Sequence, residues 1–214
     1  MNAAEMTTTE LPRISGPAIP NGRVGFYLFL GTEAMLFAGW LSAYLAERIS
    51  AGSSWPNAST TLADGAALMK LPLGAINTGF LLLTSAFVGL AARNVRRNRV
   101  QVATWCAAIG LCLASAFMGV KAFEYSEKFH HGLLPATAGE HLPLGRLWSS
   151  YYFGLTGLHG VHVIVGMLML AWMTIVGVAR RLDSRYEVAT ANIASYWHLV
   201  DAVWIALFVT YYLV

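Results

Sequence analysis

Two pairs of polar residues stand at helical spacing inside apolar stretches of this chain. His159 and His162 are three residues apart in YYFGLTGLHGVHVIVG, and His198 and Asp201 have the same spacing in YWHLVDAVW. On a helix, residues three apart share a face. Imidazole and carboxylate groups presented in this way could bind a metal ion, move a proton or form hydrogen bonds between helices.

Other polar groups also fall inside apolar runs. Glu33 lies about nine residues into its run, which is roughly 13 Å along a helix. A carboxyl group at that depth is expected to be protonated, paired or hydrated. Lys121, Glu124 and Lys128 form a row with the spacing i, i+3, i+7, so mutual pairing would reduce the energetic cost of their charges. Asn77 adds an amide at the start of another run.

The elements that must position these residues are membrane helices. The 214 residues are 57% hydrophobic and 12% charged, with a mean hydropathy of +0.55, which is typical of an integral membrane protein. Since about 20 apolar residues span a bilayer, we expect spans at about 24–47, 71–92, 101–123, 148–179 and 191–213. The expected fold is all-α, with a flexible cytoplasmic tail (1–22) and one bundle of five transmembrane helices (23–214).

The basic residues predict the orientation. Arginines cluster after the second and fourth runs, which places the amino terminus in the cytoplasm and the carboxyl terminus in the periplasm of a bacterial cytoplasmic membrane. Arg180 and Arg181 are candidates for contact with lipid headgroups, and no nucleic-acid partner is expected. Aromatic residues near the run ends are expected at the membrane interface: Tyr27, Trp148, Tyr151, Tyr152, Tyr211 and Tyr212.

Two interpretations of the buried polar residues compete. A di-iron bundle presents carboxylates and imidazoles from facing helices, but it uses repeated Glu-x-x-His pairs. Leu36 follows Glu33 at that spacing, and Glu127 follows Glu124. The other interpretation is that these groups form hydrogen bonds between helices, each contributing on the order of 1 kcal/mol.

Small residues favour the second interpretation. Gly154, Gly157 and Gly160 recur every three residues beside the histidines, and such stripes let neighbouring helices approach closely. The sequence contains no Cys-x-x-Cys-His haem motif, no phosphate-binding loop and no dinucleotide fingerprint. We therefore expect no cofactor in this chain.

Five segments resemble, in order, helices of subunit III of the haem-copper oxidases, the cytochrome c and quinol oxidase family: FYLFLGTEAMLFAGWLSAYLAE, LPLGAINTGFLLLTS, GVKAFEYSEKF, YYFGLTGLHGVHVIVG and YWHLVDAVWIALFVTYYLV. The resemblance covers about Arg23 to Val214. Its most specific elements are Thr-Gly-x-His-Gly-x-His-Val in the fourth segment and Tyr-Trp-His-x-x-Asp-x-x-Trp in the fifth.

This resemblance implies an accessory subunit of a proton-pumping terminal oxidase in aerobic respiration. Such a subunit is not itself catalytic, packs beside subunit I, supports proton uptake and binds phospholipid, while haem and copper belong to partner subunits. Carried over by motif, Glu33, Glu124 and Asp201 are buried groups of the proton environment, and Asn77, His159, His162 and His198 are structural groups between helices.

Alternatives remain open at this stage. The five-helix form is typical of quinol oxidases, whereas Glu33, where that type commonly has Asp, favours a cytochrome c oxidase. Related proteins accompany nitric oxide reductases. A stand-alone di-iron membrane enzyme would place Glu33, His159, His162 and His198 within ligand distance of one another, and a channel would conduct without partners. The sequence assigns no role to Glu187 and identifies neither the electron donor nor the lipid.

Overall fold

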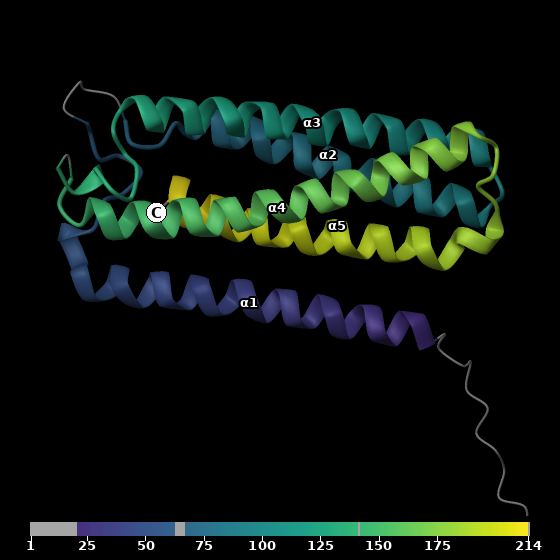
Figure 1. Cartoon of the computed structure of the whole chain (residues 1–214), viewed down its shortest axis with the longest axis horizontal. Coiled ribbons are helices and arrows are strands. Elements are labelled where there is room, and N and C mark those ends of the chain that lie inside the picture. Colours follow the sequence, from purple (N-terminus) through teal and green to yellow (C-terminus); the bar gives the residue numbers. More distant parts are fainter. Residues whose placement is uncertain (1–20, 63–66, 141, 214) are drawn as a thin grey trace, which may run out of the picture.

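Five long helices lie side by side along the length of the molecule (Figure 1), in a computed structural model that describes residues 21–62, 67–140 and 142–213. They are α1 (Asn21–Ala51), α2 (Leu71–Arg96), α3 (Val100–His130), α4 (Gly145–Val178) and α5 (Glu187–Phe208), and a π-helical segment, η4 (Val209–Leu213), continues α5. Short 3-10 helices are η1 (Gly52–Ser54), η2 (Ala138–Glu140) and η3 (Ser184–Tyr186). All five long helices are long and apolar enough to cross a membrane, which confirms the expected all-α membrane fold.

The helices are longer than the expected spans. The third span was expected to end near residue 123, but α3 continues to His130. Lys128, in this last stretch, is buried within the protein, so the change from apolar to charged sequence does not mark the end of the helix. The expected tail, residues 1–22, lies outside the described residues except for the first two residues of α1.

Three of the helices end in the same way. Asn98, Gly132 and Arg180 follow α2, α3 and α4 with φ values of 55°, 68° and 53°. In each case the N–H of this residue donates to the carbonyl three residues earlier, and the next N–H donates to the carbonyl five residues earlier. This is the Schellman motif, which satisfies carbonyls that the helix leaves unpaired. Glycine and asparagine tolerate this backbone conformation, whereas in Arg180 it costs roughly 1–2 kcal/mol.

Helix α1 is peripheral to the other four. α2 packs along α3 and α5, and α4 packs along the same two helices. Among the described helices, α1 makes close backbone contacts with α5 and α4, and it lies on their outer side in Figure 1. In the most apolar 18-residue stretch of α1, 11% of the residues are buried, whereas the corresponding share for α5 is 44%. Membrane lipid or another protein must therefore cover most of α1.

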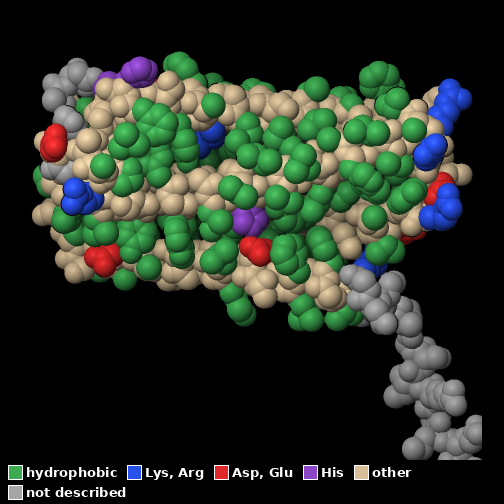
Figure 2. All heavy atoms as spheres, viewed as in Figure 1, with side chains coloured by type: hydrophobic (Ala, Val, Ile, Leu, Met, Phe, Trp, Pro, Cys, Tyr) green, Lys and Arg blue, Asp and Glu red, His purple; other side chains and the backbone are tan. Residues whose placement is uncertain are grey.

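The two ends of the bundle differ in charge. The arginine-rich end carries the turns at residues 97–99 and 179–186, and the long-loop end carries the connections at 52–70 and 131–144. Basic side chains crowd the arginine-rich end, on the right of Figure 2, while the faces between the ends are largely hydrophobic. This distribution suits a bundle whose middle lies in hydrocarbon.

Glycines provide close contacts, although not where the sequence predicted them. A Cβ on Gly166 would lie 2.9 Å from the buried ring of Trp197, so α4 and α5 meet there at glycine distance. In the predicted stripe, only Gly154 is closely packed, against Trp40. The nearest atom to a Cβ on Gly157 is 4.0 Å away, and a Cβ on Gly160 would have no neighbour within 4 Å. The three glycines lie on different sides of α4, so they do not all face one neighbouring helix.

Candidate functional site

A carboxylate surrounded by hydrogen-bond donors lies at the junction of α3, α4 and η4. Glu124 accepts hydrogen bonds from the Tyr152 hydroxyl (2.7 Å) and the Tyr212 hydroxyl (2.7 Å to each carboxylate oxygen). The Lys121 ammonium lies 3.1 Å from Glu124 Oε2 and 3.2 and 3.3 Å from the two tyrosine hydroxyls. All four side chains are buried. With Lys128, they form what we call the Glu124 network.

The two lysines of the Glu124 network have different partners. Lys121 pairs with Glu124 one helical turn away, and its Nζ lies 5.2 Å from the centre of the Trp204 ring. Lys128 instead donates to the Leu68 carbonyl (2.7 Å) and ties the 52–70 connection to α3. The sequence predicted mutual pairing of the whole row. Pairing is found for Lys121 and Glu124, but Lys128 bonds to the backbone of a different segment.

The Glu124 network can stabilise the bundle. Burying a charged group costs desolvation free energy, and this cost is offset only when the lone pairs and protons of the group have hydrogen-bond partners. Here the carboxylate receives two O–H donors and an ammonium, so one buried group links α3 to α4 and η4. The carboxylate therefore fixes three segments relative to one another.

Aromatic residues at the ends of the spans are more deeply buried than expected. Tyr152 has no exposed surface, and Trp148, Tyr211 and Tyr212 are at most 4% exposed. These four rings pack inside the protein, in one cluster with Trp55, Leu68 and Leu133 of the two long connections. Tyr27, by contrast, is 53% exposed. Sequence reasoning therefore missed Tyr152 and Tyr212 as partners of Glu124.

A second polar contact joins α1 to α4 at mid-helix. His162 Nε2 lies 2.9 Å from Glu33 Oε2, and His162 Nδ1 lies 2.8 Å from the Leu158 carbonyl. Since a carbonyl only accepts, Nδ1 carries a proton. The Nε2–Oε2 contact therefore contains one shared proton, on either the imidazole or the carboxyl group. Both side chains are partly exposed, Glu33 at 20% and His162 at 13%.

A third polar contact joins α5 to α2. His198 Nδ1 lies 2.8 Å from the Ser85 hydroxyl. Asp201, one turn further along α5, is 6% exposed and faces the same serine. Among the described residues, its Oδ1 has no hydrogen-bond partner. His198 is exposed but links α5 to α2 through Ser85, and Asp201 lies in the interior.

His159 and Asn77 differ from the expectation of hydrogen bonds between helices. Both are buried, yet within the described part of the chain neither side chain has a hydrogen-bond partner. The His159 ring instead stacks on Trp204 at 5.3 Å and meets the edge of Phe117 at 5.9 Å. The imidazole also lines a pocket of about 240 Å³ between α3 and α4. His159 is therefore an aromatic packing residue in this structure.

The di-iron alternative required Glu33 and three histidines to converge. Glu33 contacts His162, whereas His198 contacts Ser85 on α2 and His159 packs against Trp204. Across residues 21–62, 67–140 and 142–213, no three His, Cys, Asp or Glu side chains gather in a group that could hold a metal ion. The geometry that this alternative predicted is absent from these segments.

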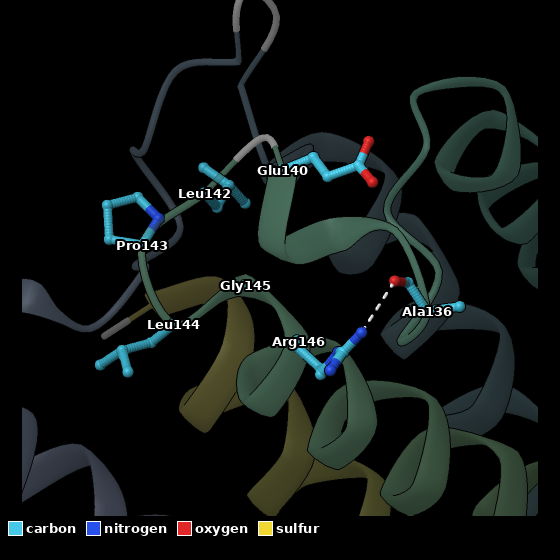
Figure 3. A pocket seen from close by; sticks show the side chains of 7 residues that line it. All are labelled: Ala136, Glu140, Leu142, Pro143, Leu144, Gly145 and Arg146. Carbon is cyan, nitrogen blue, oxygen red and sulfur yellow. Dashed lines mark hydrogen bonds between the residues drawn. The ribbon is translucent and has the colours of Figure 1, made fainter.

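A pocket lies away from all these groups, at the long-loop end. It measures about 590 Å³ and lies between η2, the connection to α4 and the first turn of α4. Figure 3 shows Arg146 reaching across toward the Ala136 carbonyl, 3.4 Å away, with Glu140 on the opposite rim. No residue predicted from the sequence as functional lines this pocket.

The arginine-rich end is held by exposed ion pairs. Arg96 Nε lies 3.0 Å from Glu187 Oε1, which joins the end of α2 to the start of α5 and gives Glu187 a structural contact. Arg185 pairs with Asp183 in the turn between α4 and α5. Arg180 and Arg181 are exposed at this end, where a lipid phosphate could reach them. Exposed pairs of this kind contribute about 0–1 kcal/mol.

Comparison with known proteins identifies the family to which this chain belongs. The family model described as cytochrome c oxidase subunit III matches residues 16–214. The chain is 30% identical to a cytochrome c oxidase subunit 3 of Bacillus sp. (strain PS3), across 100% of this chain and 98% of the relative. It is 28% identical to a probable quinol oxidase subunit 3 of Staphylococcus saprophyticus (90% and 88% covered) and 30% identical to the cytochrome c oxidase subunit 3 of Triticum aestivum (89% and 67% covered). With five membrane-spanning helices and a family match over nearly its whole length, the chain belongs to the cytochrome c oxidase subunit III family and is an integral membrane subunit III of a haem-copper oxidase.

Proposed function

We propose that this chain packs directly against subunit I of its oxidase, stabilises it and supports its proton uptake without taking part in electron transfer. The observation that carries this proposal is the use of the polar groups within the helices. Glu33 with His162, Ser85 with His198 and Lys121 with Glu124, Tyr152 and Tyr212 all bond within the bundle, mostly between helices. Haem and copper would then belong to the partner subunits.

Purification of the assembled complex tests this proposal. A tag on this chain should retain a haem-bearing catalytic subunit in a mild detergent, and the visible spectrum of the complex should identify its haems. The reduced spectrum with either cytochrome c or a quinol as donor would identify the electron donor, for which relatives of both kinds exist. Recovery of the chain from native membranes without any haem-bearing partner would refute the proposal.

Glu33 and His162 support the part of the proposal that concerns protons, because they hold a shared proton at a partly exposed position. Glu33→Gln should leave assembly intact, since a glutamine amide can still bond to the imidazole and a neutral hydrogen bond contributes only about 0.5–1.5 kcal/mol. Inactivation during turnover should become modestly faster, as measured by oxygen consumption over successive turnovers.

The matched control is Glu47→Gln, which changes an exposed carboxylate on the same helix and should behave as the wild type. If Glu33→Gln abolished oxygen reduction in a fully assembled complex, the accessory role would have to be abandoned.

The proposed orientation has the arginine-rich end in the cytoplasm. In a chain whose native cysteines, Cys106 and Cys112, are replaced by alanine, Leu134→Cys should react with a membrane-impermeant maleimide in intact cells. Arg97→Cys should react only after permeabilisation, because it lies at the arginine-rich end. The opposite labelling pattern would reverse the orientation.

A further inference from the structure

An imidazole lies on the outside of the bundle in the middle of a membrane-spanning helix. His198 is exposed, although it is about 16 Å along the axis from the start of α5 and about 22 Å from the end of η4. Its Nδ1 contacts Ser85 of α2, but within residues 21–62, 67–140 and 142–213 its Nε2 has no hydrogen-bond partner. Lipid tails cannot bond to this nitrogen. The outward Nε2 therefore indicates that a polar group of another molecule contacts it.

The Ser85 hydroxyl determines what kind of group can pair with Nε2. Ser85 is close to both His198 and Asp201, and Asp201 is 6% exposed, with an Oδ1 that has no hydrogen-bond partner in the described segments. If the serine donates to Nδ1, Nε2 carries the proton of the neutral imidazole and donates outward. If the serine donates to Asp201, Nδ1 donates to the serine and Nε2 accepts. A hydroxyl or an amide pairs with Nε2 in either case, because both groups can donate and accept.

Small side chains surround His198. On α2, Ala86 follows Ser85 and is exposed, and a Cβ on Gly89, one turn further, would have no neighbour within 4 Å. On α5, Ala194 lies one turn before His198 and is partly exposed. We call Ala86, Gly89, Ala194 and His198 the α2–α5 surface. Small residues allow helices to approach closely in a membrane, so a further helix can come near enough for a short polar side chain to reach Nε2.

We propose that a membrane-spanning helix of a partner oxidase subunit packs on the α2–α5 surface, with a hydroxyl or amide side chain hydrogen-bonded to His198 Nε2. This interaction rests on the proposed accessory function and deepens it, because it assigns a contact surface to the partner. Helix α1 leaves this surface open. The residues of α5 that line a pocket beside α1 are different ones, among them Val203 and Ala206.

The test measures how tightly the partner subunit is held, by native mass spectrometry of the purified oxidase at decreasing concentration in detergent. An asparagine side chain reaches as far as Nδ1 of an imidazole, and a glutamine side chain reaches as far as Nε2. His198→Asn therefore keeps the contact with Ser85 and loses the outward one, whereas His198→Gln keeps the outward one. The dissociation constant should rise about three- to tenfold in His198→Asn, the range for one hydrogen bond in a membrane, and stay at the wild-type value in His198→Gln.

A second pair of variants tests the close approach of the helices. Ala86→Phe places a large side chain on the α2–α5 surface, and Ser115→Phe places the same side chain at an exposed position in the middle of α3. Both positions are exposed, so both variants should keep the wild-type helix content by circular dichroism. Ala86→Phe should raise the dissociation constant at least about tenfold, as overpacking does, and Ser115→Phe should leave it unchanged.

The outcomes separate this proposal from the accessory function. Wild-type dissociation constants in both His198→Asn and Ala86→Phe overturn the α2–α5 surface alone, and lipid then covers it. A larger effect of His198→Gln than of His198→Asn also overturns it, because the imidazole then acts within the chain through Ser85. Equal weakening by Ala86→Phe and Ser115→Phe does the same. Recovery of the wild-type chain without any oxidase subunit refutes the accessory function as well, and this result is seen before any variant is compared.

Discussion

Glu124→Leu is expected to lower the free energy of unfolding by about 3–5 kcal/mol, the range for breaking a buried ion pair by removing one partner. The substitution leaves Lys121 and Lys128 buried, at 6% and 5% exposure, without the carboxylate between them. It also removes the acceptor of the Tyr152 and Tyr212 hydroxyls. Equilibrium unfolding in mixed detergent micelles, followed by tryptophan fluorescence, measures the change.

The control for this prediction is Glu127→Gln. Glu127 lies on the same helix but pairs with Lys70 at the surface, with 25% and 45% of the two side chains exposed. Its loss should cost about 1 kcal/mol or less. Combining Glu124→Leu with Lys121→Met should recover part of the stability, because one of the two unpaired cations is removed. A Glu124→Leu protein as stable as Glu127→Gln would show that Glu124 does not hold the bundle together.

Gly74→Val should destabilise the protein by about 3 kcal/mol, the upper end of the range for overpacking. A Cβ on Gly74 would lie 2.6 and 2.7 Å from two ring carbons of Tyr212 and 2.9 Å from Phe208. The Tyr212 ring is buried and its hydroxyl is bonded to Glu124, so it cannot move aside without losing that hydrogen bond. The same unfolding measurement applies.

Gly79→Val is the matched control, since it places the same side chain on the same helix. A Cβ on Gly79 would have no neighbour within 4 Å, so this variant should unfold near the wild-type midpoint. Equal destabilisation by both valines would mean that helix propensity, and not contact with Tyr212, determines the effect.

The sequence predicts the five helices because long apolar runs have few other structural solutions in a membrane. It also predicts the pairing of Lys121 with Glu124, since their three-residue spacing determines the contact within one helix. Contacts between helices depend on how the helices rotate against one another. The spacing of residues along one helix does not determine how that helix is rotated against its neighbours. The partners of Glu33 and His198 are therefore known only from the structure.

The contacts that the sequence did not predict have a common physical origin. Tyr152 and Tyr212 stand near the ends of apolar runs, and that position does not show that they are buried inside the protein. They pack in one cluster with Trp55, Leu68 and Leu133, which belong to the connections between helices. The π-helical turn of η4 also brings Thr210, Tyr211 and Tyr212 into the interior consecutively, which an ordinary helical period does not predict. His159 was expected to bond across helices, but its ring packs against Phe117 of α3 and Trp204 of α5, and the spacing along α4 does not predict these contacts.

The peripheral position of α1 has a consequence for biogenesis. Two contacts of α1 are to residues far along the chain: Glu33 and His162 are separated by 129 positions, and Arg48 and Thr210 by 162. α1 is synthesised before the residues of α4 and η4 that it contacts, so these two contacts can form only after the later helices have been made. Insertion of α1 therefore precedes its docking on the bundle.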